Sequence, residues 1–381
     1  MRTKRKRNNV LIALMLTAMI SGTAQTGVSI ATENTQNQPA AFPSHSVLSV
    51  EDTVARSLAA SLSQPEWRAQ VREASLATDE VDLQKLMGET DSSARQELLS
   101  SVTDANQRLA TLKGLPSSVG SLLRIRLGAS SMRAQLQPGV TPWVAVTTSD
   151  ERAETITAYD SQGHRHLLDA TQVPASPVYV VDLDASKAHA TGLRVLRNEL
   201  ADSGLSVQQS KAERARSAGG WWGTKVTSVE VNDDQEPWYK GDAEMFSLVT
   251  GFGQDGKARV DSVDMPYLDS GSTVYYPNQI LVNWSLYKYN LADVVMMEDD
   301  DGTNYKALAQ ALTTALLTIT DQGAYTSLAN ALLSAIPDSW FNDDPDYVES
   351  WYTLSKNAAG RLNGAAGNAW MAVEPYFVEE L

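Results

Sequence analysis

Two acidic segments, each placed around a tight turn, hold the side chains of this chain that are most able to do chemistry. The first covers residues 232–244 and the second residues 298–305. Carboxylates at this density repel one another, so they either stay hydrated or are neutralised by a hard cation. The sequence therefore poses a choice between a cation site and two solvated loops, and it identifies no reaction.

Calcium is the cation that such loops suit best, because it accepts about six to eight oxygen ligands in irregular geometry. An EF-hand is excluded, since aligning Gly302 with its sixth position puts Met297 first and Leu308 twelfth. We expect a site built by loops at one end of a β-sandwich, a layout that resembles the calcium-dependent modules of the protein kinase C and synaptotagmin type. The alternative is that the same carboxylates are only solvated.

The candidate ligands lie in the two acidic segments and carry carboxylate or amide oxygens. They are Asp233, Asp234, Glu236, Asp242, Glu298, Asp299, Asp300, Asp301 and Asn304. Asp264 and Asp269, which flank a short turn, are secondary candidates. The only cofactor that the sequence suggests is therefore calcium.

A secreted hydrolase that acts on glycan or peptide through carboxylates is the alternative function. Glu236, Glu244 and Glu298, with Trp238 nearby, are its candidate acid and base. Glycoside hydrolysis needs two such groups about 5–9.5 Å apart, and nothing in the spacing separates an acid from a base. The sequence contains no Gly-x-Ser-x-Gly and no His-Glu-x-x-His, so the common serine hydrolase and zinc protease signatures are absent.

Cysteine and histidine, the other common metal ligands, are scarce. The chain has no cysteine and four histidines, His45, His164, His166 and His189. The missing thiols exclude thiol catalysis, iron–sulfur clusters and thiolate zinc sites. His164 and His166 lie two residues apart beside a turn, where they are either a metal-binding pair or solvated loop residues. The donors that remain favour hard, oxygen-binding cations.

Residues 1–24 have the pattern of a secretory signal peptide. A basic start precedes a short apolar run and small residues that suit cleavage after Ala24 or, second, after Ala31. A membrane-spanning helix needs roughly 20 apolar residues, more than this run provides, and an uncleaved anchor is the alternative. Residues 25–45 are polar, and we expect a disordered lead-in there. We therefore expect a secreted or periplasmic protein with no transmembrane segment in the mature chain.

The charge of the chain limits its partners. The full sequence has 31 basic and 46 acidic residues. Removing the five basic residues of the signal peptide leaves 26 basic against 46 acidic residues, a net charge of about −20. Nucleic acid is an unsuitable partner, because binding to phosphates requires a basic patch. The expected partner is an unknown ligand outside the cytoplasm.

The N-terminal part of the mature chain, residues 46–133, reads as a helical segment. Its first helix has an apolar stripe at four-residue steps, formed by Val50, Val54, Leu58 and Leu62. Pro65 suits the first turn of a second helix, and a third is expected over residues 94–112. Packing onto the rest of the fold is the simplest role for these helices, and a partner-binding bundle is the alternative.

Strand patterns follow in residues 134–218, which we assign to a small β unit and a linker. The expected strands lie at 143–148, 155–159, 166–169 and 178–183. Residues 185–218 are polar and read as a linker or an exposed helix. A glycine pair, Gly219 and Gly220, marks the expected domain boundary.

Residues 219–381 form the third predicted part, a β-sandwich-like domain with helices at 304–335. Its strand candidates lie at 227–231, 243–250, 258–263 and 279–287. Turn residues separate these runs, as in antiparallel sandwiches. Asn304 or Thr303 is expected to cap the helical stretch.

Three stretches of the chain read as family signatures. They are Glu236-Pro237-Trp238-x-x-Gly241-Asp242-Ala243-Glu244, Asp264-Met265-Pro266-Tyr267-Leu268-Asp269 and Met297-Glu298-Asp299-Asp300-Asp301-x-x-Asn304-Tyr305-Lys306. Together they resemble the signature segments of an uncharacterised family of secreted bacterial proteins, the domain-of-unknown-function family numbered 3103. The resemblance spans nearly the whole mature chain and implies export and a single architecture. It implies no activity and adds no catalytic residue.

The sequence as a whole predicts an α+β protein. Its expected parts are an N-terminal helical segment, a small β unit and a C-terminal antiparallel β-sandwich-like domain with an inserted helical stretch. The expected role is calcium-assisted binding or structure outside the cytoplasm, without chemistry of its own.

Overall fold

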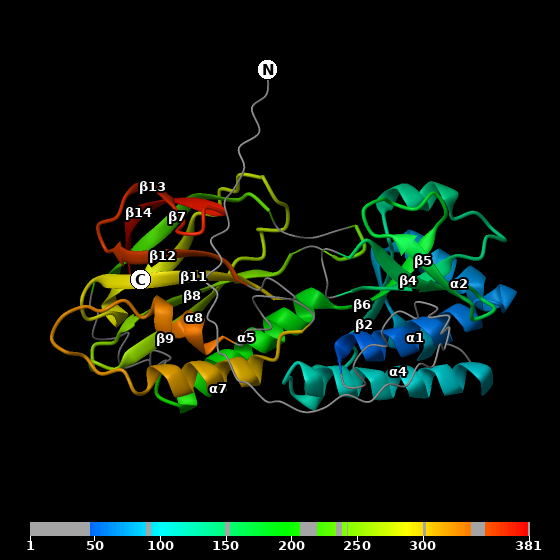
Figure 1. Cartoon of the computed structure of the whole chain (residues 1–381), viewed down its shortest axis with the longest axis horizontal. Coiled ribbons are helices and arrows are strands. Elements are labelled where there is room, and N and C mark those ends of the chain that lie inside the picture. Colours follow the sequence, from blue (N-terminus) through cyan, green and yellow to red (C-terminus); the bar gives the residue numbers. More distant parts are fainter. Residues whose placement is uncertain are drawn as a thin grey trace, which may run out of the picture. The chain divides into compact units, whose positions relative to one another are not determined.

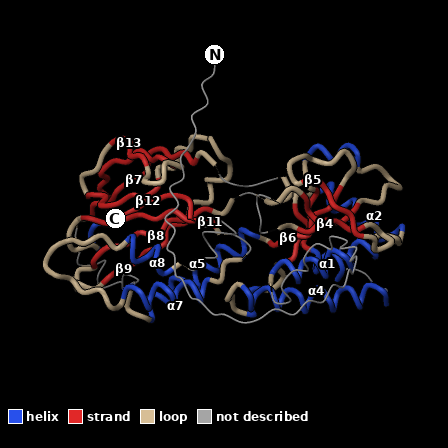
Figure 2. The backbone as a smooth tube through the Cα atoms, in the orientation of Figure 1, coloured by secondary structure: helices blue, strands red, loops and turns tan. Residues whose placement is uncertain are grey.

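The computed structural model of the chain describes eight stretches of sequence, all in one compact unit. They are residues 46–88, 93–148, 153–205, 219–233, 238–241, 243–299, 302–336 and 347–379. Helices and strands both occur throughout, so the α+β class is confirmed (Figures 1 and 2). The predicted signal peptide and lead-in lie outside the described residues.

The α-helices are α1 (Val47–Ser61), α2 (Pro65–Ala77), α3 (Leu83–Gly88), α4 (Ser93–Leu112), α5 (Ala185–Asp202), α7 (Tyr305–Leu316) and α8 (Ala329–Ala335). The strands of the first half are β1 (Glu80–Asp82), β2 (Leu123–Leu127), β3 (Trp143–Val146), β4 (Thr155–Tyr159), β5 (Arg165–Asp169) and β6 (Val178–Leu183). Those of the second half are β7 (Trp221–Val231), β8 (Met245–Phe252), β9 (Ala258–Asp264), β10 (Gln279–Asn283), β11 (Leu291–Glu298), β12 (Tyr347–Ser355), β13 (Gly360–Asn363) and β14 (Ala369–Val378). No helix among the described residues has the length and apolar character needed to cross a membrane.

The first half of the chain builds a six-stranded sheet with the order β1-β2-β6-β3-β4-β5. Its neighbours are antiparallel except β3 and β6, which run parallel. Helix α1 packs on β3, β4 and β6, and α4 packs on α1. Figure 2 shows both helices on the same side of this sheet.

Helix α1 forms where the apolar repeat predicts it. The side chain of Ser46 caps its start by accepting the N–H of Ser49 at 3.2 Å. Val50, Val54 and Leu58 are almost fully buried, because the four-residue spacing places them on one face. The predicted start of the second helix at Pro65 is also confirmed.

Two strands lie within the stretch that the sequence analysis assigned to helices. Strand β2 reads Leu-Arg-Ile-Arg-Leu, and its apolar residues are buried while its arginines are only half-buried. This alternation is the period of a strand, and flanking helices on both sides obscure it in the sequence. Strand β2 fills the place between β1 and β6, so the sheet draws on more of the chain than residues 134–218.

The second half has two four-stranded sheets. One has the order β10-β7-β14-β13 and the other the order β12-β11-β8-β9. Side chains of β8 alternate between two cores: Met245 and Val249 pack with β7 and β14, whereas Phe246 and Leu248 pack with the helices. The sheet that contains β8 therefore lies between the other sheet and the layer of α5, α7 and α8, an arrangement that Figure 1 shows.

Helix α5 corrects the assignment of residues 185–218 to a linker or an exposed helix. Its N-cap is Asp184, which accepts the N–H of Lys187 at 3.0 Å. One face of α5 buries His189, Leu193 and Leu196, and the helix packs on α7 and β9. The apolar residues are spaced for one helical face, but the surrounding Lys, Arg and Ser residues give the segment a polar composition. Residues 206–218 lie outside the described part of the chain.

Candidate functional site

The two acidic segments meet at one end of β8 and β11. These strands pair antiparallel, so that Met245 lies opposite Glu298. Just beyond the strands, the N–H of Asp299 donates to the carbonyl oxygen of Glu244 at 3.0 Å. The end of the first acidic segment therefore contacts the start of the second.

Carboxylates at this junction point to opposite faces of the sheet, because side chains alternate along a strand. Glu298 shares a face with Met245, which packs in the core between the two sheets. Asp299 and Glu244 lie on the helix side, close to His189. Glu244 and Glu298 therefore do not face a common substrate, as an acid–base pair must.

His189 is the centre of a group of polar side chains, buried at His189, Lys113, Asp299 and Tyr305 and partly exposed at Ser186 and Asp264, which we call the His189 cluster. Its members are Lys113, Ser186, His189, Glu244, Asp264, Asp299 and Tyr305. The imidazole lies 3.2 Å from Asp264 through Nε2 and 3.0 Å from the Tyr305 hydroxyl through Nδ1. The Tyr305 hydroxyl in turn donates to Asp299. The cluster joins α5, α7 and the ends of β9 and β11.

Lys113 extends the His189 cluster to the end of α4. Its Nζ lies 3.4 Å from Oδ1 of Asp299, and both side chains are at most 3% exposed. A backbone hydrogen bond also links Lys113 to the start of α7, since the N–H of Tyr305 donates to the Lys113 carbonyl at 3.1 Å. Asn304 donates to the carbonyl of Leu112 at 2.6 Å. The start of α7 is thereby fastened to the end of α4.

The charges of the His189 cluster shift the pKa values of its members. Burial alone would lower the pKa of His189, but hydrogen bonds to Asp264 and Asp299 outweigh burial and raise it from 6.5 to about 9. Burial alone would raise the pKa of Asp299, but Lys113 and then His189 hold it below its usual 3.8. Burial raises the pKa of Glu244, and the hydrogen bond from Ser186 at 2.6 Å opposes that shift.

Gly192 makes room for the Tyr305 ring. A Cβ atom at this position of α5 would lie 2.0 Å from the ring, far inside van der Waals contact. The glycine thus lets α7 approach α5 closely enough for the Tyr305 hydroxyl to reach Asp299 and His189.

The His189 cluster is arranged to hold charge. An imidazole with a pKa near 9 keeps its proton at neutral pH, so it is poorly suited to act as a general base. Asp299 is enclosed by a lysine, an imidazolium and a phenol, which satisfy its oxygens. We infer that these charges fasten secondary structure together.

Only some of the candidate calcium ligands lie among the described residues. Asp234, Glu236, Asp242, Asp300 and Asp301 lie outside the described residues. Asp299 is engaged in the His189 cluster, and Asn304 caps α7 by accepting the N–H of Ala307 at 2.9 Å, as the sequence predicts. Asp233 is exposed, and its backbone bonds to the Asn368 side chain. Across the described ranges, no three His, Asp, Glu or Cys side chains form a group able to hold a metal ion.

The histidine pair of the β4–β5 turn interacts with a carboxylate. His164 and His166 both approach Oδ2 of Asp160, at 3.1 and 2.9 Å. The His166 ring also stacks on Trp143, with the ring centroids 3.9 Å apart. These contacts give His166 a structural role in the hairpin, whereas the His164 side chain is 73% exposed.

A pocket of about 530 Å³ opens in the loop between β9 and β10. We call it the tyrosine pocket; it is lined by Pro266, Tyr267, Tyr275, Tyr276, Pro277 and Gln279. The rings of Tyr267 and Tyr275 have centroids 6.2 Å apart and planes inclined by 48°. Tyr276 is 72% exposed, a large value for an aromatic side chain. The pocket therefore offers aromatic surface to solvent.

Hydrogen bonds fix the walls of the tyrosine pocket. The Tyr267 hydroxyl donates to Oε1 of Gln279 at 2.6 Å, and Nε2 of Gln279 donates to the Asp264 carbonyl at 2.7 Å. The Tyr275 hydroxyl donates to Asp269 at 2.7 Å, and its backbone pairs with Val229 of β7. The rings are thus positioned before any ligand arrives.

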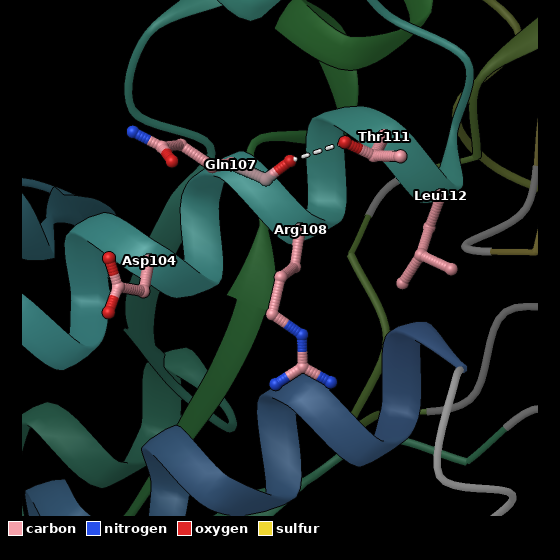
Figure 3. A pocket seen from close by; sticks show the side chains of 5 residues that line it. All are labelled: Asp104, Gln107, Arg108, Thr111 and Leu112. Carbon is pink, nitrogen blue, oxygen red and sulfur yellow. Dashed lines mark hydrogen bonds between the residues drawn. The ribbon is translucent and has the colours of Figure 1, made fainter.

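A second pocket, of about 590 Å³, lies along α4 (Figure 3). Asp104, Gln107, Arg108, Thr111 and Leu112 line it, and all five belong to this one helix. Four of them are exposed and polar, as on the solvated face of an amphipathic helix. None of the described residues that line this pocket is aromatic, in contrast to the tyrosine pocket.

The sequence indicates Glu244, Asp264 and Asp299 as candidate site residues, but it predicts neither their arrangement around His189 nor the tyrosine pocket. His189 is a single histidine in a polar segment, and its partners Asp264 and Tyr305 are 75 and 116 residues away. The tyrosine pocket had a usable local signal, since three tyrosines and two prolines occur within residues 266–277. These residues do not alternate as they would along a strand, which is typical of a loop.

Comparison with known proteins gives one match. The model of a family described as "Protein of unknown function (DUF3103)" matches residues 52–381. No curated protein matches the chain. No solved structure matches it either.

Proposed function

The chain belongs to the DUF3103 family of proteins of unknown function, and we propose that it is a binding protein that acts outside the cytoplasm. The tyrosine pocket is its ligand site. The observation that carries this proposal is the exposure of Tyr276 beside two tyrosines that hydrogen bonds already hold in place. Rigid aromatic side chains give binding surface at a low entropic cost.

Several features of the loop support a binding role. Met265 and Leu268 are buried in the core between the two sheets, and they anchor the loop on both sides of Pro266 and Tyr267. Burial, and then the nearby Asp264, raise the pKa of Tyr267, so its phenol stays neutral in the physiological range. A neutral aromatic wall on a fixed loop favours recognition over chemistry.

The binding proposal predicts a stabilising ligand. We expect at least one of choline, maltotriose, chitotriose, triproline or trilysine to raise the melting temperature by several degrees in a thermal shift assay, since a ligand at about 100 times its Kd adds roughly 2.7 kcal/mol. Tyr276→Ala should abolish the shift without changing the melting temperature of the free protein, because this side chain is mostly exposed. Tyr352→Ala, at a 40% exposed tyrosine of β12, is the matched control and should keep the shift. If no probe shifts the melting temperature, or if Tyr276→Ala keeps the shift, the proposal is wrong.

Calcium is proposed to assist this role at the acidic segments. The support is the contact between Asp299 and Glu244, which brings the described ends of the two segments together. Carboxylates that converge from two loops can supply the oxygens that calcium requires. Asp299 and Asn304 are weaker candidates than the acidic loop residues around them, because their side chains are already engaged.

Calcium addition after chelation is expected to raise the melting temperature by a few degrees, with binding visible by calorimetric titration. Asp300→Asn with Asp301→Asn should remove the effect. Asp299→Asn is a poor test on its own, because it also disturbs the His189 cluster. An unchanged melting temperature across millimolar calcium would show that the acidic segments bind no calcium.

A further inference from the structure

The tyrosine pocket also indicates the chemical class of its ligand, and the inference made here rests on the binding function proposed above. The Tyr267 and Tyr275 rings lie 6.2 Å apart with inclined planes, and Tyr276 adds a third, more exposed ring. A cation attracts the faces of aromatic rings within about 6 Å of their centroids. Three tyrosines thus line one opening that such a group can enter.

Three of the polar side chains that line the tyrosine pocket are already bonded within the protein. The Tyr267 hydroxyl, the Gln279 amide and the Tyr275 hydroxyl each bond to a neighbouring residue at 2.6–2.7 Å. A saccharide or an extended peptide needs several polar partners to fix its orientation. This lining instead suits a group that has no hydrogen-bond donors or acceptors of its own.

Charge around the tyrosine pocket favours a positive ligand. Asp269 is exposed and accepts the hydrogen bond of Tyr275. None of the residues described as lining the pocket is basic. The chain as a whole has a net charge of −15, which attracts cations.

We propose that the tyrosine pocket binds a quaternary ammonium group, such as that of choline, through its three tyrosine rings. A quaternary ammonium has a positive charge and an apolar surface, and it donates no hydrogen bond. A primary ammonium needs acceptor atoms, and Oε1 of Gln279 and the Asp269 carboxylate already accept hydrogen bonds from tyrosine hydroxyls. The same group occurs free in solution and in phosphocholine lipid headgroups.

Calorimetric titration with choline and with 3,3-dimethylbutan-1-ol, its neutral isostere, tests the proposal on the intact mature chain. We expect choline to bind about tenfold more tightly, the difference that a cation–π contribution gives. Tyr276→Phe keeps a ring and should bind choline within about twofold of the wild type, whereas Tyr276→Leu keeps only apolar bulk and should lose about tenfold. Tyr352→Leu is the matched control and should leave the affinity unchanged. Equal binding of the two compounds, or full binding by Tyr276→Leu, would overturn the proposal.

A sedimentation assay with phosphatidylcholine and phosphatidylglycerol vesicles separates the two sources of the ammonium group. Binding to phosphatidylcholine vesicles alone supports the lipid headgroup, and binding to choline without vesicle binding supports a free small molecule. If a saccharide or peptide stabilises the protein through Tyr276 and choline does not bind, this inference fails and the proposed binding function stands. If none of these probes binds, both fail.

Discussion

Replacing His189 with leucine is expected to lower the free energy of unfolding by about 3–5 kcal/mol, the range found when one partner of a buried ion pair is removed. His189 is 2% exposed and lies within 3.5 Å of both Asp299 and the Tyr305 hydroxyl. Without it, Asp299 keeps Lys113 as its only cation in the His189 cluster. Since domains are stable by only about 5–15 kcal/mol, this loss is a large part of the total.

Urea unfolding followed by tryptophan fluorescence measures this loss. His164→Leu is the matched control, because that side chain is 73% exposed, and surface changes of this kind cost about 0.5 kcal/mol or less. His189→Gln, which retains a polar side chain without the charge, should fall between the control and His189→Leu and should remain folded if His189→Leu does not. A loss below about 1 kcal/mol for His189→Leu would contradict the structural role of the cluster.

Raising the pH is expected to destabilise the wild-type protein between about pH 6.5 and 9. The folded state raises the pKa of His189 from 6.5 to about 9, against the effect of burial, through its bonds to Asp264 and Asp299. The folded state then binds one proton more than the unfolded state in this interval, so stability falls as pH rises. The contribution is fully present below pH 6.5 and lost above pH 9, and it amounts to about 3 kcal/mol.

Unfolding free energies measured at pH 6.5, 7.5, 8.5 and 9.5 check this dependence. Asp264 and Asp299 raise the pKa of His189, and Glu244, Lys113 and Tyr305 are the other titratable members of the His189 cluster. His189→Gln removes the titrating group, so its stability should change far less over the same interval. A wild-type stability that is constant from pH 6.5 to 9.5, or equal slopes in the two proteins, would show that folding does not raise the pKa of His189.

Secondary structure was predictable wherever a local pattern fixes it. Val50, Val54 and Leu58 repeat at four-residue steps, so a helix places them on one face, and all three are buried in the structure. The cap at Asn304 was predictable for the same reason, since it depends on residues within one turn of the helix. Strand β2 was missed because its five residues lie between longer helical patterns.

The environments of the acidic side chains could not be predicted from local sequence patterns. Their density of carboxylates is visible in the sequence, but the direction of each side chain depends on the register of β8 with β11. That register sends Glu298 toward one core and Asp299 toward the helices. Neighbours in the sequence thus have different environments, and a list of carboxylates alone does not distinguish them.

The sequence by itself determined the acidic charge, the lack of cysteine, the helices and strands that have a strong local pattern, and the α+β class, because composition and short-range periodicity carry this information. Only the tertiary structure decided that Asp299 is enclosed by Lys113 and His189, and that the tyrosines of the β9–β10 loop form a pocket. The physical reason is that these arrangements depend on long-range contacts. Packing and strand register create them, and no spacing along the chain encodes them.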